Sequence, residues 1–589
     1  MAVENLITEH IDIWTSAVKT RSTSGRGSSK KLELYGVKKL RELILELAVR
    51  GKLVPQDAND EPASALLERI AQEKAQLVKD KKIKKTKPLS SVKEQEKTFD
   101  IPRGWSWTRI GLITTFVNGF AFKSSSFQDS GVGIVKIGDI SFAGELTPNT
   151  MSRVDTSVIK DLDPSLRVNR GDMVIAMSGA TTGKVGFNTT NEVFYLNQRV
   201  GKFIPHQIDL DYLFFPLTTK IAENLEKSLG SAIPNLSTGQ INDIVIALPP
   251  LQEQHRIVAK VDELMALCDQ LEQQTESSIE VHQVLVTTLL DTLTNSADAD
   301  ELMQNWARIS EHFDTLFTTE ASIDQLKQTI LQLAVMGKLV PQDPSDEPAA
   351  ELLKRIAEEK AQLVKEKKIK KEKALPPIAE DEKPFELPSG WEWCRLGDLE
   401  LSSEAGWSPK CLDTPRSEDN WGVLKVSAVT WNQYNPMENK ELPNSLAPRE
   451  HLEVQDGDFL ISRANTADLV AKAVIVPNDS PTHLMMSDKI IRFRFSDKVS
   501  SHYINLFNNS QFARNYYSQV AGGTSSSMKN VSREQIKNLL ICLPPVATQT
   551  AIIDIVGCFF DICEQLKQKV QENQITQFQL TDAIVEQAV

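Results

Sequence analysis

A duplication constrains the fold of this chain more than any other feature of its sequence. The segment LAVRGKLVPQD at residues 47–57 recurs as LAVMGKLVPQD at residues 333–343, which is 286 positions later. Without a gap, residues 47–85 match residues 333–371 at 31 of 39 positions. A repeat of this length and identity predicts two structural units in tandem.

The repeated segments are predicted to be helical. In both copies the sequence Asp-Glu-Pro is followed by Ala, Leu, Glu and Lys, which are strong helix formers. The segment GKLVP at residues 51–55, with its copy at residues 337–341, supplies the break that separates a first helix from a second. Each unit is therefore expected to open with a helical hairpin.

A second match, at an offset of 295, marks the end of each unit. LPPLQEQHRIV from Leu248 lies over LPPVATQTAII from Leu543, and each begins an apolar stretch with steps of three and four residues. Such spacing is typical of a helix that packs on another helix. The predicted contact positions are Ile257, Val261, Leu264, Cys268 and Leu271 in the first unit, and Ile552, Ile555, Phe559, Ile562 and Leu566 in the second.

Two bodies lie between these constant parts. Runs such as GIVKIGDIS and RGDMVIAMSG in the first body, and GVLKVSAVT and DGDFLIS in the second, are β-branched and punctuated by Gly, which predicts strands. The predicted fold class is α+β, with two β-rich domains separated by long antiparallel coiled-coil-like helices in a pseudo-two-fold tandem repeat. The predicted domains are an N-terminal extension (1–35), a constant helical region (36–100), a first body (101–250), a central constant helical region (251–385), a second body (386–545) and a C-terminal constant helix (546–589).

Motifs of catalysis and metal binding are absent from the sequence. GATTGKV at residues 179–185 resembles a phosphate-binding loop, but it has three residues instead of four between its glycines and Val after its Lys. There is no HExxH, no GxSxG and no Gly-rich dinucleotide turn, and the six cysteines include no CxxC pair. We expect a chain that is not catalytic by itself and holds no metal.

The sequence also predicts the compartment. No apolar run approaches the roughly 18 to 20 residues that a membrane helix requires. The N-terminus MAVENLITEH lacks the basic and then apolar pattern of a secretory signal. We therefore expect a cytoplasmic protein with no membrane contact.

Charge is distributed unevenly along the chain. The net charge of -13 at pH 7 at first argues against nucleic acid. However, residues 251–330 hold 4 Lys and Arg against 15 Asp and Glu, whereas residues 101–250 hold 13 of each. The bodies are thus nearly neutral, and their clustered cations could contact phosphate or base edges, with a solvated polar face as the alternative for any one residue. These cations are Lys123, Lys136, Lys184, Arg199 and Lys202 in the first body, and Lys425, Arg463, Lys472, Lys489, Arg492 and Arg494 in the second.

Several motifs, in the same order in both units, carry a resemblance to a known family. They include LKQTILQLAVMGKLVPQD, NGFAFKSSSF with GIVKIGDI, GDMVIAMSGATTGKVGF, YLNQRV and IPNLSTGQINDIVIALPPLQEQ. With this tandem layout, the chain resembles the DNA-specificity subunit of type I restriction-modification enzymes. The second body departs from the pattern in places: WGVLKVSAVTW lacks the Gly-Asp, and ISRANTADLVAKAV replaces the Gly-rich loop.

The resemblance implies a division of labour between subunits. The two bodies would be target-recognition domains that each read one half of an asymmetric, split site in double-stranded DNA. The duplicated helices would hold them apart and dock one methyltransferase (modification) subunit per half. Methyl transfer from S-adenosylmethionine, and ATP- and magnesium-dependent translocation and cleavage, would belong to the partner methyltransferase and restriction/translocase subunits.

The candidate DNA-binding residues occupy Gly-rich or strand-edge segments that align between the bodies but differ in identity. A non-catalytic scaffold whose two divergent domains bind proteins is the alternative, and a self-sufficient nuclease or methyltransferase is disfavoured because its motifs are missing. The candidates are Lys123, Ser124, Ser125, Lys136, Thr182, Lys184, Asn197, Gln198 and Arg199 in the first body, and Lys410, Lys425, Arg463, Asn465, Asp488 and Lys489 in the second.

Overall fold

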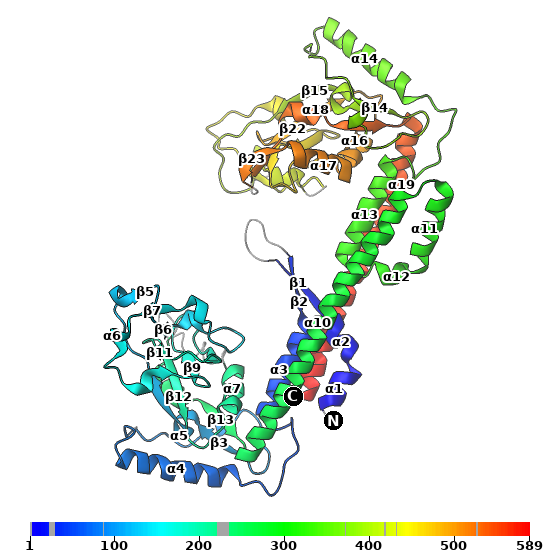
Figure 1. Ribbon diagram of the computed structural model, residues 1–589. Coiled ribbons are helices and arrows are strands. Elements are labelled where there is room, and N and C mark those ends of the chain that lie inside the picture. The colour runs from blue at the N-terminus through cyan, green and yellow to red at the C-terminus, as the bar shows by residue number, and fades with distance from the viewer. Residues whose placement is uncertain are drawn as a thin grey trace. The chain divides into compact units, whose positions relative to one another are not determined.

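The computed structural model divides the chain into two units, each of which mixes helices and small sheets (Figure 1). Unit 1 comprises residues 1–21, 32–277 and 574–589, and unit 2 comprises residues 22–31 and 278–573. The mixture of helix and sheet agrees with the prediction. The structure describes residues 3–22, 30–85, 87–220, 235–371, 373–417, 420–430, 433–525 and 528–589.

Unit 1 holds the first body between helices of the constant regions. Its sheets have the strand orders β10-β9-β12-β4, β5-β7-β6-β11-β8 and β13-β3. Its helices are α1 (Val3–Glu9), α2 (Ile11–Ser16), α3 (Tyr35–Val49), α4 (Ala63–Lys79), α5 (Ile110–Ile113), α6 (Thr156–Ile159), α7 (Leu210–Thr219) and α9 (Thr238–Asn242). Its strands are β3 (Ser106–Arg109), β4 (Thr114–Asn118), β5 (Phe127–Gln128), β6 (Val132–Val135), β7 (Ser152–Val154), β8 (Arg167–Val168), β9 (Met173–Ala176), β10 (Val185–Phe187), β11 (Phe194–Leu196), β12 (Val200–Pro205) and β13 (Val245–Leu248).

Unit 2 repeats much of this order. Its sheets are β15-β22-β18-β20, β17-β16-β21, β19-β24-β23 and β14-β25. Its helices are α11 (Ala299–Glu311), α12 (Phe313–Leu316), α13 (Glu320–Val335), α14 (Ala349–Lys365), α15 (Leu396–Leu399), α16 (Ser501–Asn508), α17 (Gln511–Val520) and α18 (Arg533–Lys537). Its strands are β14 (Glu392–Arg395), β15 (Glu400–Ala405), β16 (Gly422–Leu424), β17 (Asn439–Glu441), β18 (Phe459–Ser462), β19 (Ala464–Asn465), β20 (Ala473–Ile475), β21 (Leu484–Met485), β22 (Ile490–Phe495), β23 (Gly522–Ser525), β24 (Met528–Asn530) and β25 (Leu540–Leu543). The chain also forms a hairpin, β1 (Val18–Ser22) with β2 (Lys30–Leu34), and two long helices, α10 (Leu251–Asn295) and α19 (Val546–Ala588).

Both predicted helices are present in each unit, but they do not pack on each other as a hairpin: α3 packs on α2 and α7 while α4 packs on α5, and α13 packs on α16 and α17 while α14 packs on α15 (Figure 1). Gly51 and Gly337 both have φ +70, and a Cβ on Gly51 would lie 2.4 Å from Cγ of Pro102. Only glycine adopts this conformation without strain, so the first helix ends just before this glycine. The next helix, α4 or α14, begins further along the chain and has 17 residues. The break between two helices is therefore confirmed in both copies.

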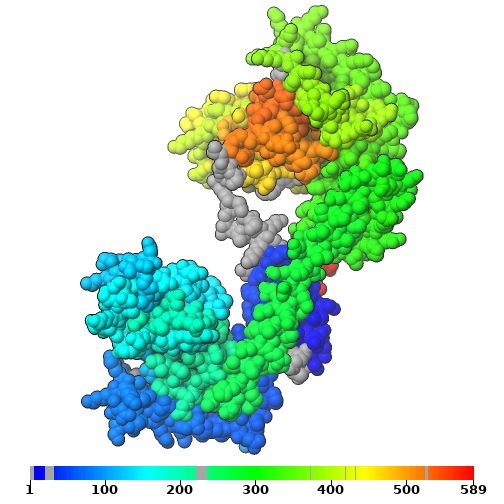
Figure 2. Space-filling model, in the orientation of Figure 1, coloured from blue at the N-terminus to red at the C-terminus, as the bar shows by residue number. Residues whose placement is uncertain are grey.

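The second helix of each pair is fixed to the body of its own unit in part through backbone acceptors. Helix α4 lies along the first body, where Lys74 donates to the carbonyls of Gly111 and Thr114 at 2.7 Å each (Figures 1 and 2). Burial lowers the pKa of Lys74 to about 8. In unit 2, Lys360 on α14 donates to the carbonyl of Gly397 at 2.8 Å. Because the acceptors are main-chain groups, this contact does not depend on the side chains of the body.

The Leu-Pro-Pro motif leads into each exit helix through a buried glutamine. Gln254, in the first turn of α10, accepts from the backbone N–H of Asp209 at 2.9 Å and donates to the carbonyl of Pro249 at 3.0 Å. Gln549, in the first turn of α19, forms the same pair of bonds within unit 2. Both side chains are fully buried, so they lock the start of the helix to the body.

Of the five predicted contact positions on α10, all but the half-buried Leu271 are buried, whereas on α19 only Ile552 is buried and Ile555, Phe559 and Leu566 are half-buried. Ile562 is 49% exposed, so its prediction was wrong, and the buried position is Cys563. The offset of 295 maps Cys268 onto Cys563, whereas the apolar spacing favoured the larger neighbour. Three buried positions match at this offset: Ile257, Val261 and Cys268 on α10 correspond to Ile552, Val556 and Cys563 on α19.

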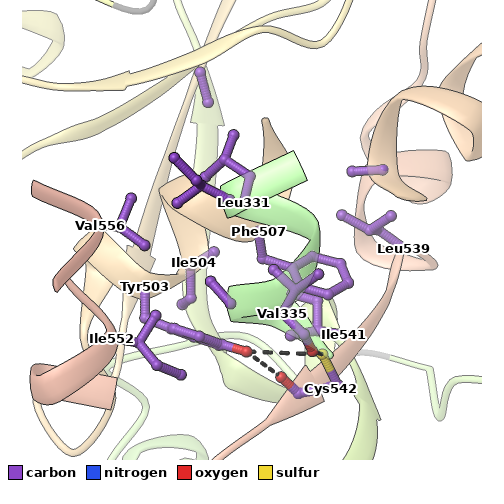
Figure 3. Packing of buried hydrophobic residues seen from close by; sticks show 14 of the residues in the cluster. Leu331, Val335, Tyr503, Ile504, Phe507, Leu539, Ile541, Cys542, Ile552 and Val556 are labelled. Atoms are coloured by element: carbon purple, nitrogen blue, oxygen red, sulfur yellow. Dashed lines mark hydrogen bonds between the residues drawn. The ribbon is translucent and has the colours of Figure 1, made fainter. Parts of the chain in front are cut away.

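In unit 2 one hydrophobic cluster joins the constant helices to the body (Figure 3). Leu331 and Val335 on α13 pack near Ile504 on α16 and Ile552 on α19. The Tyr503 hydroxyl donates to the carbonyl of Cys542 on β25 at 2.7 Å, and the Cys542 thiol donates to the carbonyl of Val335 at 2.8 Å. Entry helix, body and exit helix therefore share a core in this unit.

Helix α19 also corrects the expectation that no segment is apolar enough to span a membrane. One 18-residue window within it has a mean hydropathy of 1.6, and 28% of that window is buried. By length and composition alone, this helix is long and apolar enough to cross a membrane. The search for an uninterrupted apolar run missed it because polar residues separate the apolar ones. Its side chains Ile552, Val556 and Cys563 contribute to the cluster described above, which accounts for part of this apolar content.

Part of the N-terminal extension has a counterpart in unit 2. His10 precedes α2 with φ -120 and ψ 22, and His312 precedes α12 with φ -115 and ψ 18. Both lie in similar sequences, ITEHID and ISEHFD, and both carbonyls accept from the N–H groups three and four residues later. The offset here is 302, which exceeds 286 by 16 residues because the hairpin β1–β2 is inserted after α2. Trp14, which is fully buried in unit 1, fixes this segment against Gly36, where a Cβ would lie 2.2 Å from the Trp14 carbonyl oxygen.

Three of the clustered cations are buried, namely Lys202, Arg492 and Lys184, and the last is described with its loop below. Lys202 pairs with Asp172 at 2.9 Å, and Arg492, which is 1% exposed, pairs with Asp458 at 2.7 Å. Arg492 also donates to the carbonyls of Glu453 and His451. These residues therefore stabilise their sheets and are not available to DNA, contrary to the sequence interpretation.

Replacing Arg492 by Met should destabilise unit 2 by about 3 to 5 kcal/mol, because Asp458 would be left as a buried, unpaired charge. The loss is expected as a lower denaturant midpoint of the transition assigned to unit 2. Arg494→Met, two positions along the same strand and exposed, is the control and should change the free energy of unfolding by less than about 0.5 kcal/mol. Equal effects of the two substitutions would contradict this role of Arg492.

Candidate nucleic-acid interface

Several loops leave the four-stranded sheet of unit 1 at one edge. Strand β4 ends where β12 begins, since Asn118 pairs with Gly201, and β9 ends beside them, since Ala176 pairs with Val200. Adjacent strands in this sheet are antiparallel, so the loop after β4, the loop from β9 to β10 and the turn before β12 meet there. We call this the loop edge of unit 1. It comprises residues 119–126, 177–184 and 197–199.

Backbone contacts hold this loop edge together. The N–H of Gly119 donates to the carbonyl of Val200 at 3.0 Å, and the N–H of Phe120 donates to that of Leu196 at 2.9 Å. A Cβ on Gly119 would lie 1.9 Å from the carbonyl oxygen of Asn197. No side chain fits between these two segments, so glycine is required here.

The second sheet of the first body places Lys136 at the same edge. Strands β6 and β11 are parallel, so Lys136, after β6, and Asn197, after β11, emerge on the same side. The N–H of Asn197 donates to the carbonyl of Val135 at 3.1 Å. Lys136 donates to Ser152 Oγ at 2.7 Å, and its Nζ lies 3.8 Å from the centroid of the Phe127 ring. Part of its hydrogen-bonding capacity is thus used internally.

Unit 2 builds a matching loop edge. The N–H of Gly406 donates to the carbonyl of Ile490 at 3.2 Å, and the N–H of Trp407 donates to that of Met486 at 2.9 Å. A Cβ on Gly406 would lie 2.1 Å from the Met486 carbonyl oxygen. The backbone arrangement therefore repeats that of Gly119 and its neighbours. The loop edge of unit 2 comprises residues 406–410, 463–472 and 486–489.

The exposed side chains at these edges are mostly hydrogen-bond donors. Arg and Lys suit phosphate and guanine, and Asn and Gln suit adenine. Within the described parts of the chain there is no cluster of three His, Cys, Asp or Glu residues that could hold a metal ion. Among the candidate residues, the exposed ones are Lys123, Ser124, Ser125, Gln198 and Arg199 in unit 1, and Lys410 and Lys489 in unit 2.

Comparison with known proteins decides the family. A family model described as the type I restriction modification DNA specificity domain matches residues 102–281. Over the full length of both proteins, the chain is 48% identical to the specificity subunit of the type I restriction enzyme EcoEI and 42% identical to that of EcoAI, both from Escherichia coli. The chain belongs to the specificity subunits of type I restriction enzymes. A solved structure described as the basis of complex assembly and conformational transition of the type I R-M system covers 83% of this chain and 98% of its own, with 16% identity and a TM-score of 0.47.

This specificity subunit is therefore a non-catalytic subunit that recognises DNA and assembles with the other subunits of a restriction-modification system. Membership of the family favours this function over the protein-binding scaffold. It also agrees with the expectation that the chain is not an enzyme by itself.

The structure of the specificity subunit brings most of the predicted residues to the two loop edges. Whether each one contacts DNA stays a prediction. Lys425 follows β16 as Lys136 follows β6, and it forms an ion pair with Glu438 at 3.5 Å. The residues at or beside a loop edge are Lys123, Ser124, Ser125, Lys136, Asn197, Gln198 and Arg199 in unit 1, and Lys410, Lys425, Arg463, Asn465, Asp488 and Lys489 in unit 2.

Thr182 and Lys184 lie in the loop from β9 to β10, but their side chains are buried. Thr182 Oγ1 donates to the carbonyl of Gly179 at 2.7 Å, and Lys184 Nζ donates to the carbonyl of Ile140 at 2.8 Å. Burial lowers the pKa of Lys184. Gly183, with φ +90, turns the chain directly into β10, so the motif forms no open cradle for phosphate. This corrects the prediction that these two side chains reach DNA.

Asp488 in unit 2 occupies the turn position that Gln198 occupies in unit 1. Both precede a strand by two residues, and the Asp488 carboxylate accepts a hydrogen bond from Ser408 while Lys489 lies 3.3 Å away. Burial alone would raise the pKa of Asp488, but the hydrogen bond from Ser408 and the charge of Lys489 outweigh it and lower the pKa. A carboxylate that only accepts, in place of an amide that also donates, suits a different base.

Sequence reasoning missed the aromatic residues of this region. Phe120 and Trp407 each follow the glycine that no side chain can replace, and Arg449 lies 4.2 Å from the Trp407 ring. The dipeptides Gly-Phe at residues 119–120 and Gly-Trp at residues 406–407 were the available signal. Phe142, which lies outside every motif, gave no signal.

Proposed function

We propose that residues 101–250 and 386–545 are target-recognition domains that each read one half of an asymmetric, bipartite site in double-stranded DNA. The observation that carries this proposal is the pair of loop edges. They share a backbone framework around Gly119 and Gly406 but present different side chains at matching positions. Domains built this way have the same shape and different base preferences.

We also propose that the constant regions form the framework between these domains. In this proposal residues 36–100, 251–385 and 546–589 are long, antiparallel, coiled-coil-like helices, arranged with pseudo-two-fold symmetry. The support is the equal length of α4 and α14 and the matching buried positions on α10 and α19 at an offset of 295. Knobs at steps of three and four residues are the pattern of such packing.

Two methyltransferase subunits and the restriction/translocase subunits are the proposed partners, in the cytoplasm. S-adenosylmethionine, ATP and magnesium would act in those partners. The support is that each unit carries two exposed apolar residues on its long helices, at positions that match between the units, and equivalent contact residues suit two copies of one partner. These residues are Leu267 and Leu580 in unit 1, and Ile562 and Leu285 in unit 2.

Methylation mapping tests the proposed function. DNA from cells that carry this chain with its partner subunits should be methylated at one bipartite sequence whose halves differ and are separated by unread base pairs. A continuous or palindromic methylated site would contradict the assignment of one half to each domain.

The loop-edge residues give a finer prediction. Arg199→Ala and Lys489→Ala should each weaken binding of the cognate duplex by about 1 to 3 kcal/mol where the side chain reads a base, and relax selectivity at one position of one half-site. The measurement is the affinity for a set of duplexes with single base-pair changes. Arg170→Ala is the control, because Arg170 is exposed before β9, at the opposite edge of the same sheet. A loss that is equal for all duplexes would show phosphate contact in place of base reading.

A further inference from the structure

Phe142 is 87% exposed, more than any other large apolar side chain in the described parts of the chain. An exposed aromatic side chain forgoes the favourable free energy of burying its apolar surface. An aromatic side chain that the fold holds in an exposed position therefore needs an explanation. Phe142 lies in the first target-recognition domain, in the loop after the short 3-10 helix Ile137–Asp139.

The loop that carries Phe142 is tightly held. Ile140 and Leu146 pair across its base, and the N–H of Ser141 donates to the carbonyl of Glu145 at 2.8 Å. Gly144, with φ +83, closes the turn, and a Cβ there would lie 2.5 Å from the ring of Phe214. The backbone therefore presents Phe142 in one place.

Lys184 connects this loop to the loop edge of unit 1. Its Nζ donates to the carbonyl of Ile140 at 2.8 Å and lies 3.8 Å from the centroid of the Phe142 ring. Lys184 belongs to the loop from β9 to β10, so Phe142 lies beside the loop edge with a cation against the ring. The lysine fixes both the backbone that carries the ring and the ring itself.

We propose that Phe142 contacts DNA in the first half-site by stacking on a base or wedging into a base step, and that Lys184 is a positioning residue for its loop. Aromatic and other apolar side chains are used in this way at partly opened base steps. This inference rests on the proposed function of the domain. DNA is favoured over a protein partner because Lys184, against which the ring packs, belongs to the same loop edge as the exposed donors Lys123 and Arg199.

This arrangement does not recur in the described part of the second target-recognition domain. Lys472 is the counterpart of Lys184, because its carbonyl accepts from Ser462 at 2.9 Å as that of Lys184 accepts from Ala176 at 2.8 Å. Among the described residues no aromatic ring lies against Lys472. The proposed stacking contact is therefore confined to the half-site read by residues 101–250.

The test uses the full chain in complex with its methyltransferase partners and a duplex that contains the mapped site. Phe142→Ala should weaken binding by about ten-fold to a hundred-fold, without changing the slope of log K against log salt, because stacking releases no counterions. Phe142→Trp should restore most of the affinity. Val193→Ala is the matched control, since Val193 is an exposed apolar residue before β11, at the opposite edge of the domain. It should leave binding unchanged.

A fluorescent base analogue reports on the base directly. With 2-aminopurine at each adenine of the site in turn, the fluorescence of one position in the first half should rise on binding of the natural chain and not on binding of Phe142→Ala. No position in the second half should depend on Phe142.

The positioning role of Lys184 has its own readout. Lys184→Met should weaken binding about as much as Phe142→Ala, and the double variant should bind no more weakly than either single variant, because both act through one contact. The salt slope should stay the same. A slope smaller by about one would show that Lys184 contacts a phosphate itself, and would overturn the positioning role.

Two results would overturn the stacking contact. One is unchanged affinity and unchanged fluorescence in Phe142→Ala. The other is a Phe142→Ala chain that fails to assemble with the methyltransferase subunits, which would make the ring a protein contact. If the natural complex itself showed no sequence-selective binding, the proposed function would fail before the role of Phe142 was reached.

Discussion

Exchange of residues 101–250 for the matching domain of another specificity subunit should replace one half of the recognised DNA site and leave the other half unchanged. The exchanged segment contains the whole loop edge of unit 1. Of the anchors that remain behind, Lys74 bonds to the main-chain carbonyls of Gly111 and Thr114, whereas Glu96 and Glu73 bond to the side chains of Arg109 and Gln207. A new domain with the same backbone and with these two side chains can therefore be held in the same way.

The expected effect of this exchange is large. The affinity for a specific site exceeds the affinity for non-specific DNA by about 10³ to 10⁷-fold. When one domain is replaced, the affinity for the original site should therefore fall to the non-specific level. Methylation mapping of cells with the chimera measures both halves at once. The reciprocal exchange of residues 386–545 should alter only the other half. A chimera with two altered halves, or one that no longer assembles because the partners bind the exchanged domain, would contradict this modular arrangement.

Insertion of four residues after Leu271 in α10 should lengthen the unread gap between the two half-sites. Four helical residues add ~6 Å along the axis and rotate the remainder of the helix by about 40°. At about 3.4 Å per base pair, the gap should grow by one or at most two base pairs, with some loss of affinity from the rotation. The half-sites themselves should keep their sequences, because neither loop edge is changed.

A control insertion separates length from general damage. Four residues placed after Ala374, in the exposed segment between α14 and β14, should leave the gap as it is. Methylation mapping again reads both gap and half-sites. An unchanged gap after insertion at Leu271 would show that this helix does not set the spacing, and that the duplicated helices serve only to recruit partners.

The sequence was most informative where a local rule decides the structure. The turns at Gly51 and Gly337 were predicted because glycine is needed between two runs of helix formers. By contrast, the burial of Lys184 depends on the carbonyl of Ile140, 44 residues away, and no local motif reveals that contact. Periodicity also has limited resolution, as Ile562 shows: one position on a helix separates an exposed residue from the buried Cys563.

Insertions limited the detection of the repeat. The likeness of ITEHID to ISEHFD was hidden because the hairpin β1–β2 shifts the offset from 286 to 302. The exposed donors at the loop edges were predicted correctly as neighbours of strand ends, but Phe142 was not. Its place depends on the bonds of Ser141 and the packing of Gly144, which become visible only in three dimensions.

The loop edges are held by main-chain bonds, and this has a consequence for how new specificities arise. Where N–H and carbonyl groups carry the architecture, as around Gly119 and Gly406, the exposed side chains beside them make little contribution to folding. Point mutations at positions such as Gln198 and Asp488 can then accumulate without a penalty in folding free energy. A lineage can acquire a different recognition sequence by single substitutions, each of which leaves a folded and assembled protein. Gly119 and Gly406 must stay glycine throughout, because any side chain there would collide with the backbone.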